Sequence, residues 1–341
     1  MSRRGKSRFL SLALFTTALA ALLAACTKDY PYNSLAPAGP VAEKQADLYW
    51  LVFWIAVAVF VLVEGGLVYV LWRFRRRSPG DTPRQVHGNT RLEIAWTIIP
   101  ALLLAGVAVP TVGTIFDLAE SPEGAMHVEV KAHRFWWEVR YPGLDVVTAN
   151  EVHIPAGEQV VMELTSQDVI HSFSVPRLAG KQDVVPGRTN ILNLSADEPG
   201  TYKGQCQEFC GLSHANMKFT VVAQTPADFD AWVQQQLAEA AAPEEGGLAA
   251  ATLPTCFACH VIAGVSPEPD PNAPPPPIPG PDLTHLAGRQ TIAAGMLPNT
   301  EEGLAEWLRD PPAVKAGSNM PDYGLNEDEI EALVEYLRSL G

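Results

Sequence analysis

The stretch Cys206-Gln-Glu-Phe-Cys210-Gly-Leu-Ser-His214-Ala-Asn-Met217 brings together two thiols, an imidazole and a thioether. A second imidazole lies upstream, in the string Asp168-Val-Ile-His171-Ser. These soft and borderline ligands select copper rather than magnesium or calcium. Two cysteines four residues apart can bridge two copper ions, although a protein outside the cytoplasm can also join them in a disulfide. The two histidines and the methionine at these spacings favour the metal site.

Short β-rich runs surround this string, and together they predict an all-β domain over residues 121–225. Examples are residues 159–164, 190–194 and 218–222, with proline and glycine between them. Short strands at such a spacing indicate an antiparallel sandwich or barrel. The metal-binding string is then a loop between a strand that begins at Gly200 and another that begins at Lys218. Because His171 lies in an earlier strand, only the folded sandwich can assemble the site.

The string resembles the binuclear Cu(A) motif of cytochrome c oxidase subunit II, whose soluble domain is cupredoxin-like. The resemblance implies six copper ligands: His171, Cys206, Glu208, Cys210, His214 and Met217. The two cysteines would bridge the coppers, and each histidine would cap one of them. The methionine and the backbone carbonyl of Glu208 would be weak ligands. The Glu208 side chain would also contact a magnesium ion shared with subunit I.

A second cofactor motif, Cys256-Phe-Ala-Cys259-His260, matches the attachment pattern of a c-type haem. A disulfide or half of a zinc site can have the same spacing. The order of the later motifs resembles an all-α class I cytochrome c over residues 251–341, after a helix and linker at 226–250. In such a domain Met320 is the second axial ligand, which raises the iron potential. Met296 is the alternative methionine, in a weaker context.

The sequence at the N-terminus predicts that the protein is exported from the cytoplasm. Residues 1–25 combine basic residues with an apolar run, as in a secretory signal peptide. The run ends Leu-Ala-Ala-Cys26, which resembles a lipoprotein cleavage box and makes Cys26 a predicted lipidation site. A signal that is not cleaved, or is cleaved elsewhere, and that leaves a free cysteine is the alternative. Cys26 is also the cysteine left over when the other four of the five form two pairs.

Residues 26–120 contain two apolar segments, at about 48–72 and 92–116, each long enough for a transmembrane helix. The arginine-rich connection between them predicts a cytoplasmic loop. A two-helix hairpin of this orientation places both termini and the redox domains on the periplasmic face of a bacterial cytoplasmic membrane. The net charge of −14 disfavours binding to nucleic acid and favours basic protein partners.

Two features near these segments have more than one interpretation. Thr90-Arg-Leu-Glu93 is a candidate capping box at the start of the second helix. The family resemblance also places Glu93 at the mouth of a proton path into subunit I. In the aromatic run Phe135-Trp136-Trp137, relatives usually have a Trp-Tyr-Trp sequence whose first tryptophan receives electrons. Phe135 departs from that pattern, and packing of the sandwich also explains the two tryptophans.

The resemblance covers nearly the whole chain and implies the electron-input subunit of a haem-c-containing aa-type cytochrome c oxidase. Electrons would pass from an external cytochrome c through haem c and Cu(A) to haem a and the haem a3–Cu(B) centre of subunit I. This transfer would be coupled to proton pumping, with subunit III as a further partner. Oxygen reduction itself would occur in subunit I.

Three other functions share parts of this pattern. A quinol oxidase subunit II shares the fold but lacks copper, and the intact ligand set disfavours it. A Cu(A)-containing nitric-oxide reductase component can retain the hairpin and differs in its partner subunit. A membrane-anchored copper-binding lipoprotein belongs to another class, and it needs neither Glu93 nor a covalent haem.

Overall fold

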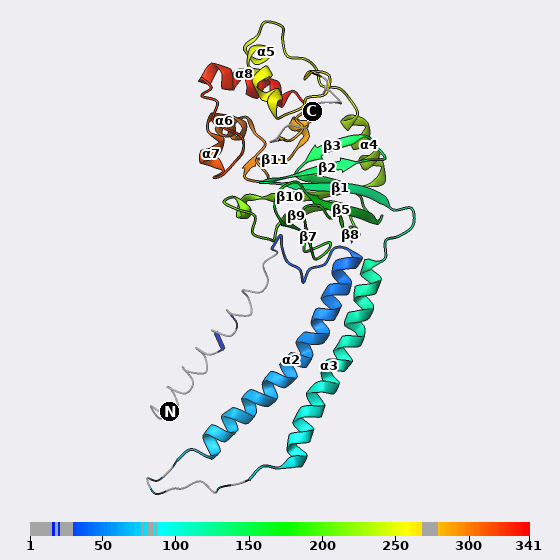
Figure 1. The fold of residues 1–341 in the computed structure, drawn as a ribbon, viewed down its shortest axis with the longest axis vertical. Coiled ribbons are helices and arrows are strands. Elements are labelled where there is room, and N and C mark those ends of the chain that lie inside the picture. The colour runs from blue at the N-terminus through cyan, green and yellow to red at the C-terminus, as the bar shows by residue number, and fades with distance from the viewer. Residues whose placement is uncertain are drawn as a thin grey trace, which may run out of the picture.

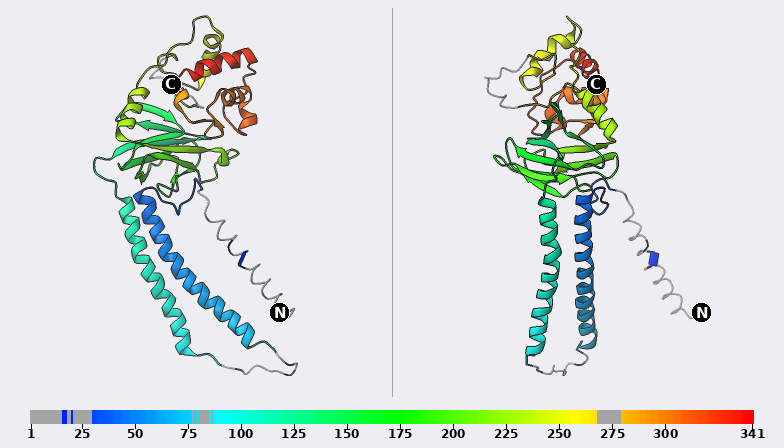
Figure 2. Two further views of the ribbon diagram at one scale, coloured as in Figure 1. Left: turned by 180° about the vertical axis from the view of Figure 1, so that it is seen from behind. Right: turned by 90° about the vertical axis from the view of Figure 1, so that its right-hand side faces the viewer.

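The structure is a computed structural model that describes residues 16, 17, 20, 30–76, 78, 80, 85, 87–267 and 279–341. The predicted lipidation site Cys26 and most of the predicted signal peptide lie outside these residues. Two long helices run side by side from one end of a β-sandwich, and a helical domain covers the opposite end (Figure 1 and Figure 2). This arrangement matches the predicted order of hairpin, β domain and α-rich domain.

The hairpin consists of α2 (Pro40–Arg73) and α3 (Thr90–Ala119), which have mean hydropathies of 2.5 and 2.1. Both are long and apolar enough to cross a membrane and extend beyond the predicted segments. The predicted capping box at Thr90 is wrong by one residue. The Asn89 side chain caps α3 by accepting hydrogen bonds from the backbone N–H groups of Arg91 and Leu92, at 3.1 and 3.4 Å. An asparagine in extended conformation satisfies these otherwise unpaired donors.

The hairpin is attached to the sandwich at the ends of both helices. The Asn193 side chain donates hydrogen bonds to the carbonyls of Leu118 and Glu120, at 3.1 and 3.0 Å, at the end of α3. Before α2, Gly39 passes so close to the Ser195 carbonyl that a Cβ would lie 2.1 Å from its oxygen. Only glycine allows this approach, so the start of α2 is held against the sandwich.

The sandwich has two five-stranded sheets. The first has the order β3-β2-β1-β5-β8, with bounds β1 (Met126–His133), β2 (Trp136–Tyr141), β3 (Val146–Ala149), β5 (Val160–Ser166) and β8 (Asn190–Leu194). The second has the order β4-β10-β9-β6-β7, with bounds β4 (Glu151–Pro155), β6 (His171–Ser174), β7 (Lys181–Val184), β9 (Gly200–Cys206) and β10 (Lys218–Gln224). The expectation of a purely antiparallel sandwich is wrong for two pairs, since β1 runs parallel to β5 and β4 parallel to β10.

An aromatic cluster fills the sandwich beneath the metal-binding string. Trp137 is completely buried and meets Phe173 edge-on, with ring centroids 5.5 Å apart. Phe173 stacks on Phe219 at 4.1 Å. A Cβ on Gly204 of β9 would lie 2.2 Å from the Phe219 ring, so the strand that ends at Cys206 packs directly on this cluster. The cluster therefore gives the metal-binding string a rigid base.

The C-terminal part begins with α4 (Pro226–Gln236), which packs on the sandwich through Phe229 and Val233. This helix ends at Gln236, within the range 226–250 predicted to hold a helix and a linker. The remaining elements form a second core: α5 (Leu248–Thr252), η3 (Leu253–Ala258), η4 (Leu286–Gly288), β11 (Thr291–Ile292), β12 (Leu297–Pro298), α6 (Glu301–Arg309), α7 (Pro311–Val314) and α8 (Glu327–Arg338). The domain is helical apart from the small β11–β12 ribbon.

Candidate copper and haem sites

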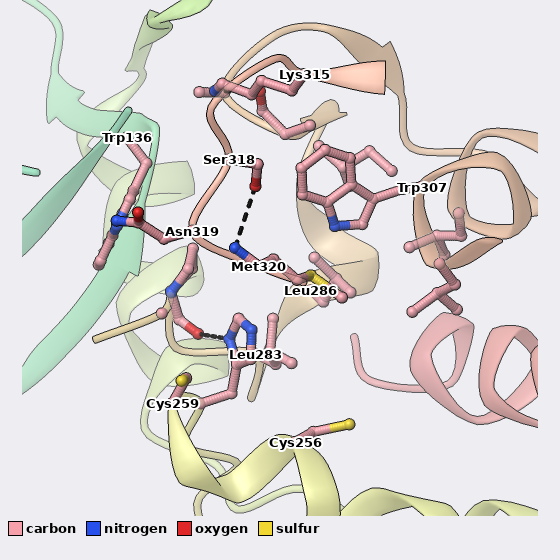
Figure 3. Close-up of a pocket in the computed structure, with 18 of the residues that line it drawn as sticks. Trp136, Cys256, Cys259, Leu283, Leu286, Trp307, Lys315, Ser318, Asn319 and Met320 are labelled. Atoms are coloured by element: carbon pink, nitrogen blue, oxygen red, sulfur yellow. Dashed lines mark hydrogen bonds between the residues drawn. The ribbon is translucent and has the colours of Figure 1, made fainter. Parts of the chain in front are cut away.

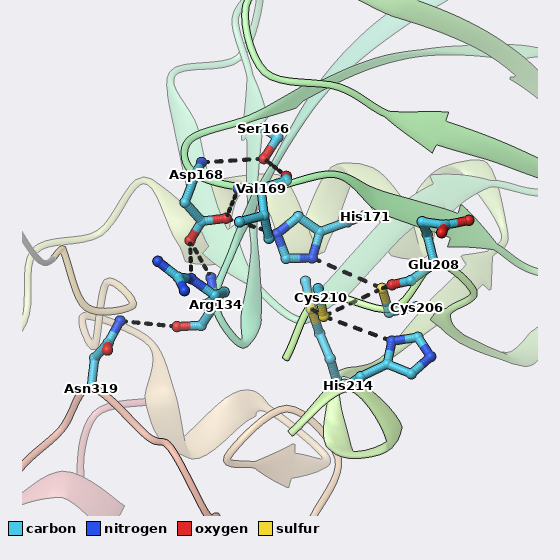
Figure 4. A network of polar contacts seen from close by, with 11 residues as sticks. Arg134, Ser166, Asp168, Val169, His171, Cys206, Glu208, Cys210, His214 and Asn319 are labelled. Atoms are coloured by element: carbon cyan, nitrogen blue, oxygen red, sulfur yellow. Dashed lines mark hydrogen bonds and ion pairs between the residues drawn. The ribbon is translucent and has the colours of Figure 1, made fainter. Parts of the chain in front are cut away.

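The two cysteines and two histidines of the predicted copper site converge at one edge of the sandwich (Figure 4). The sulfurs of Cys206 and Cys210 are 3.9 Å apart, so they form no disulfide. His171 Nδ1 lies 3.9 Å from the sulfur of Cys206, and His214 Nδ1 lies 3.7 Å from that of Cys210. Each imidazole thus points one nitrogen at one thiol, as expected of two capping ligands around a bridged pair.

The two predicted weak ligands lie at the same place. Met217 Sδ is 3.9 Å from the Cys210 sulfur, and its side chain is completely buried. The Glu208 carbonyl oxygen accepts a hydrogen bond from the Cys206 thiol at 3.3 Å. The end of β9, the turn through η2 (His214–Asn216) and the start of β6 supply these groups. All six predicted copper ligands therefore surround one small volume.

Asp168 orients His171 and was not assigned a role from the sequence. His171 Nε2 donates a hydrogen bond to Asp168 Oδ1 at 2.8 Å, which turns Nδ1 toward the thiols. Backbone N–H groups of Val169 and Arg134 bind the same carboxylate at 2.7 and 2.8 Å. Burial raises the Asp168 pKa, but the hydrogen bond from His171 and these N–H groups outweigh it and lower the pKa to about 2. The carboxylate thus fixes the tautomer that a metal ligand needs.

The paired thiols favour binding of a cation. Sharing one proton in their mutual hydrogen bond lowers the pKa of Cys206 and raises the pKa of Cys210. One thiolate forms readily in this arrangement, whereas a second needs a compensating positive charge. The donor set of two sulfurs, two imidazoles, a thioether and a carbonyl fits copper by its softness.

The three aromatic residues occupy different surroundings. Phe135 is 7% exposed, and its ring lies 3.1 Å from where a Cβ on Gly211 would be. Trp136 stacks on His133, with ring centroids 4.4 Å apart, and lines the cavity of the C-terminal domain. Trp137 lies in the sandwich core. The first aromatic position of the run is therefore covered in this chain.

The haem-attachment motif lines a cavity in the C-terminal domain, with Cys256 and Cys259 on one side and Met320 on another (Figure 3). The His260 ring nitrogen Nδ1 donates to the Pro281 carbonyl at 2.7 Å, which leaves Nε2 free to bind a metal. Burial lowers the pKa of His260 and so favours the neutral, ligating form. Of the two methionines after His260, Met320 lines the cavity and Met296 does not.

Two further observations fit a haem in this cavity. A Cβ on Gly280 would lie 2.5 Å from the His260 ring, so glycine makes room for the imidazole. Arg289 lines the cavity, and burial lowers the pKa of its guanidinium. Arg289 Nε has no hydrogen-bond partner within the described chain, while Nη2 donates to the Asp282 carbonyl. Because a haem carries two carboxylates, a buried cation whose Nε has no acceptor suits it. Arg289 was missed from sequence, where a lone arginine gives no signal.

Comparison with known proteins identifies the family of this chain. A cytochrome c oxidase subunit 2 of Alkalihalophilus pseudofirmus is 40% identical, with 98% of this chain and 97% of that protein covered. This chain belongs to the cytochrome c oxidase subunit II family. A cytochrome c oxidase subunit 2 of Bacillus sp. PS3 is 38% identical, covering 94% and 95% of the two chains. A quinol oxidase subunit 2 of Bacillus spizizenii is 34% identical and covers 70% of this chain and 75% of its own.

Family models match three parts of this subunit II chain. The transmembrane domain of cytochrome c oxidase subunit II matches residues 33–113, its periplasmic domain matches 138–224, and cytochrome c matches 246–341. The predicted family, the three-part fold and the assignment to an oxidase complex are confirmed. Membership implies a membrane-bound subunit with a periplasmic copper domain, a haem domain and a subunit I partner.

Proposed function

We propose that this chain is the electron-input subunit of a terminal cytochrome c oxidase. It accepts electrons from an external cytochrome c at the haem domain and delivers them through the copper domain to haem a and the haem a3–Cu(B) centre of subunit I. The oxidase couples this transfer to proton pumping. The observation that supports the proposal is that the residues predicted to bind copper and those predicted to bind haem gather in two domains that touch.

In the copper domain, His171, Cys206, Cys210 and His214 hold the metal, with Met217 and the Glu208 carbonyl as weak ligands. The bound copper pair supplies a one-electron carrier. The chain keeps its ligands fixed, because they end or begin strands and the aromatic cluster supports them. Fixed ligands need little rearrangement when the charge at a metal changes, which suits electron transfer.

In the haem domain, Cys256 and Cys259 would attach the haem through thioethers, and His260 and Met320 would hold its iron. The haem supplies the second one-electron carrier. The cavity walls keep water from the iron with apolar side chains such as Leu253, Leu286 and Leu333, which are nearly fully buried. An apolar shell and a methionine ligand both raise the iron potential.

Three further assignments belong to the same proposal. The Glu208 carboxylate, on a half-buried residue, takes part in a magnesium site shared with subunit I. Glu93 lies in the first turn of α3, at the end of the hairpin remote from the sandwich, where protons from the cytoplasm enter. Trp136 is the best placed aromatic relay, since it lines the haem cavity while Trp137 is part of the core.

The proposal also includes location and partners. Both termini and the redox domains lie on the periplasmic face of a bacterial cytoplasmic membrane, and subunit III joins subunit I in the complex. The two apolar helices and the exposed apolar surface along them support a location in the membrane, because such a surface requires lipid or a partner helix.

Optical and EPR spectra of the full chain, produced with haem maturation and copper loading, test the function. We expect a c-type haem spectrum together with a mixed-valence binuclear copper signal. Cys206→Ser should abolish the copper signal and keep the haem, while Cys259→Ser should disturb the haem attachment and keep the copper. A haem without copper, or a signal from a single copper ion, contradicts the proposal.

A further inference from the structure

The haem domain rests directly on the loop that carries the copper ligands. The Ser213 hydroxyl, between Cys210 and His214, donates a hydrogen bond to the Ala316 carbonyl at 2.6 Å. The Asn319 side chain donates to the Arg134 carbonyl at 3.1 Å (Figure 4). Residues 315–320, the methionine segment, end at Met320. The segment that presents the iron ligand therefore touches the loop that presents the copper ligands.

The Phe135 ring fills the space between these two segments. It lies 3.1 Å from where a Cβ on Gly211 of the copper loop would be, and 3.4 Å from where one on Gly317 would be. A Cβ on Gly317 would also lie 3.2 Å from the Leu212 side chain. The absence of side chains on the two glycines allows the three segments to pack this closely.

Lys315 joins the two domains through its amine. Its Nζ donates one hydrogen bond to the Phe135 carbonyl of the copper domain, at 2.7 Å, and another to the Ala293 carbonyl of the haem domain, at 2.8 Å. The residue is only 4% exposed, and no ion pair found in the described chain includes it. Burial lowers its pKa to about 7. Burying an amine this deeply costs free energy. The burial of Lys315 is tolerated because two fixed carbonyls accept hydrogen bonds from its Nζ.

A second set of buried contacts lies on the same interface. Glu151 of β4 is 2% exposed, and its Oε1 accepts a hydrogen bond from the backbone N–H of Gln290 at 2.7 Å. The Lys218 backbone N–H at the start of β10 donates to the Ala294 carbonyl at 3.1 Å. These hydrogen bonds add to those of Lys315, Ser213 and Asn319 in holding the haem domain on the sandwich.

We propose that Lys315 is a positioning residue that locks the haem domain onto the copper domain, so that the methionine segment and the copper loop stay in one fixed contact. The face around Phe135 is covered as a result, and an external donor delivers electrons to the haem domain. This inference rests on the proposed relay for its functional consequence, whereas the lock itself concerns only the contact between the two domains.

The test uses the full chain with haem and copper bound, and compares Lys315→Met with Lys181→Met. Methionine keeps a long apolar side chain but loses both hydrogen bonds, whereas Lys181 is exposed on β7 and serves as the matched control. Losing a buried hydrogen-bond partner costs enough to favour undocking by about 10-fold or more. Hydrogen exchange in peptides spanning residues 210–217 and 315–320 should therefore accelerate about 10-fold in Lys315→Met, and remain unchanged in the control.

The same variants then separate the lock from the relay. With both spectra intact, Lys315→Met should slow equilibration of an electron between haem and copper after photoreduction of the haem. Exchange rates and electron equilibration both equal to those of the parent protein would overturn the lock. If the amides of these segments are protected in the parent protein but no electron passes between haem and copper, the proposed relay is wrong and the contact between the domains is still supported.

If Lys315→Met loses its haem spectrum, two variants of Glu151 test the contact between the domains instead. Glu151→Leu removes the acceptor for Gln290, while Glu151→Gln retains an oxygen at that position. If the domains are locked together, hydrogen exchange in residues 315–320 should be faster in the leucine variant than in the parent protein. The glutamine variant should exchange at the parent rate. Equal protection in both variants would show that the two domains do not separate as a unit, which overturns the proposal.

Discussion

Replacing Asp168 by asparagine tests how far the carboxylate beside His171 supports copper binding. Asp168 Oδ1 accepts from His171 Nε2 and from the Val169 N–H, while Oδ2 accepts from the Arg134 N–H. An amide has only one oxygen, so in Asp168→Asn either the histidine or the Arg134 N–H loses its acceptor. The charge that favours the metal-binding orientation of the imidazole is also lost.

The size of the effect follows from the pKa of Asp168. Its lowering from 3.8 to about 2 corresponds to about 2 kcal/mol of favourable interaction with the ionised carboxylate. Since the side chain is 22% exposed, solvent screening reduces the usable part to between about 1 and 2 kcal/mol. We therefore expect copper affinity to fall about 5- to 30-fold, within the range seen when a group supporting a metal ligand is removed.

Competition with a chromophoric copper chelator measures this affinity on the full chain. Asp230→Asn is the matched control, because Asp230 is exposed on α4 and distant in sequence from the ligands. The copper signal of Asp168→Asn should keep its binuclear character, since no ligand is removed. Equal copper affinity in the two variants would refute the assignment of Asp168 as the group that orients His171.

Three other predictions concern the core, the pH dependence and the haem. Gly204→Ala should destabilise the copper domain by about 1–3 kcal/mol, because the new methyl group meets the Phe219 ring. Gly143→Ala, with open space around it, is the control, and equal melting temperatures in calorimetry would contradict this packing. Burial raises the pKa of Glu138, but hydrogen bonds from His133 and Arg140 and the Arg140 charge lower it to about 2. Its stabilisation, about 3 kcal/mol at most, is therefore present above about pH 4.5 and lost as the pH falls toward 2. In Glu138→Gln the melting temperature should therefore fall less steeply below about pH 4.5 than in the parent protein. An equally steep fall would contradict the stabilising role of the contacts of Glu138 with His133 and Arg140. Met320→Ala should lower the haem midpoint potential by ~100 mV or more, whereas Met296→Ala should leave it unchanged. Redox titration decides between them, and the reverse result would assign the axial ligand to Met296.

Much of the fold and site could be predicted because the signals are local. The copper string holds five candidate ligands close together in sequence, and the strands on either side begin at Gly200 and Lys218 as predicted. The apolar segments of the hairpin are continuous, so their length alone indicated spanning helices. The helix cap at Asn89 was misplaced because Thr90 and Asn89 are both good capping residues. The backbone conformations of these two residues decide which one caps the helix, and the sequence alone does not give those conformations.

The parallel pairing of strands could not be predicted from the sequence. Strand periodicity does not show direction, so the pairing of β1 with β5 and of β4 with β10 follows only from the complete chain path. The role of Asp168 was equally hidden. Its spacing to His171 is visible in the sequence, but the carboxylate reaches the imidazole only because the turn before β6 folds back on itself.

The sequence by itself determined which side chains are candidate ligands for copper and haem, which segments are apolar enough for a membrane, and in what order the domains follow. Tertiary structure alone decided how the two redox domains meet. Lys315 and Phe135 are 180 residues apart, and neither residue type indicates an interface. A ligand motif is local because its donors share one loop. A docked surface is assembled from segments whose proximity depends on the packing of both domains, and so the burial of Lys315, Phe135 and Glu151 appears only in the folded chain.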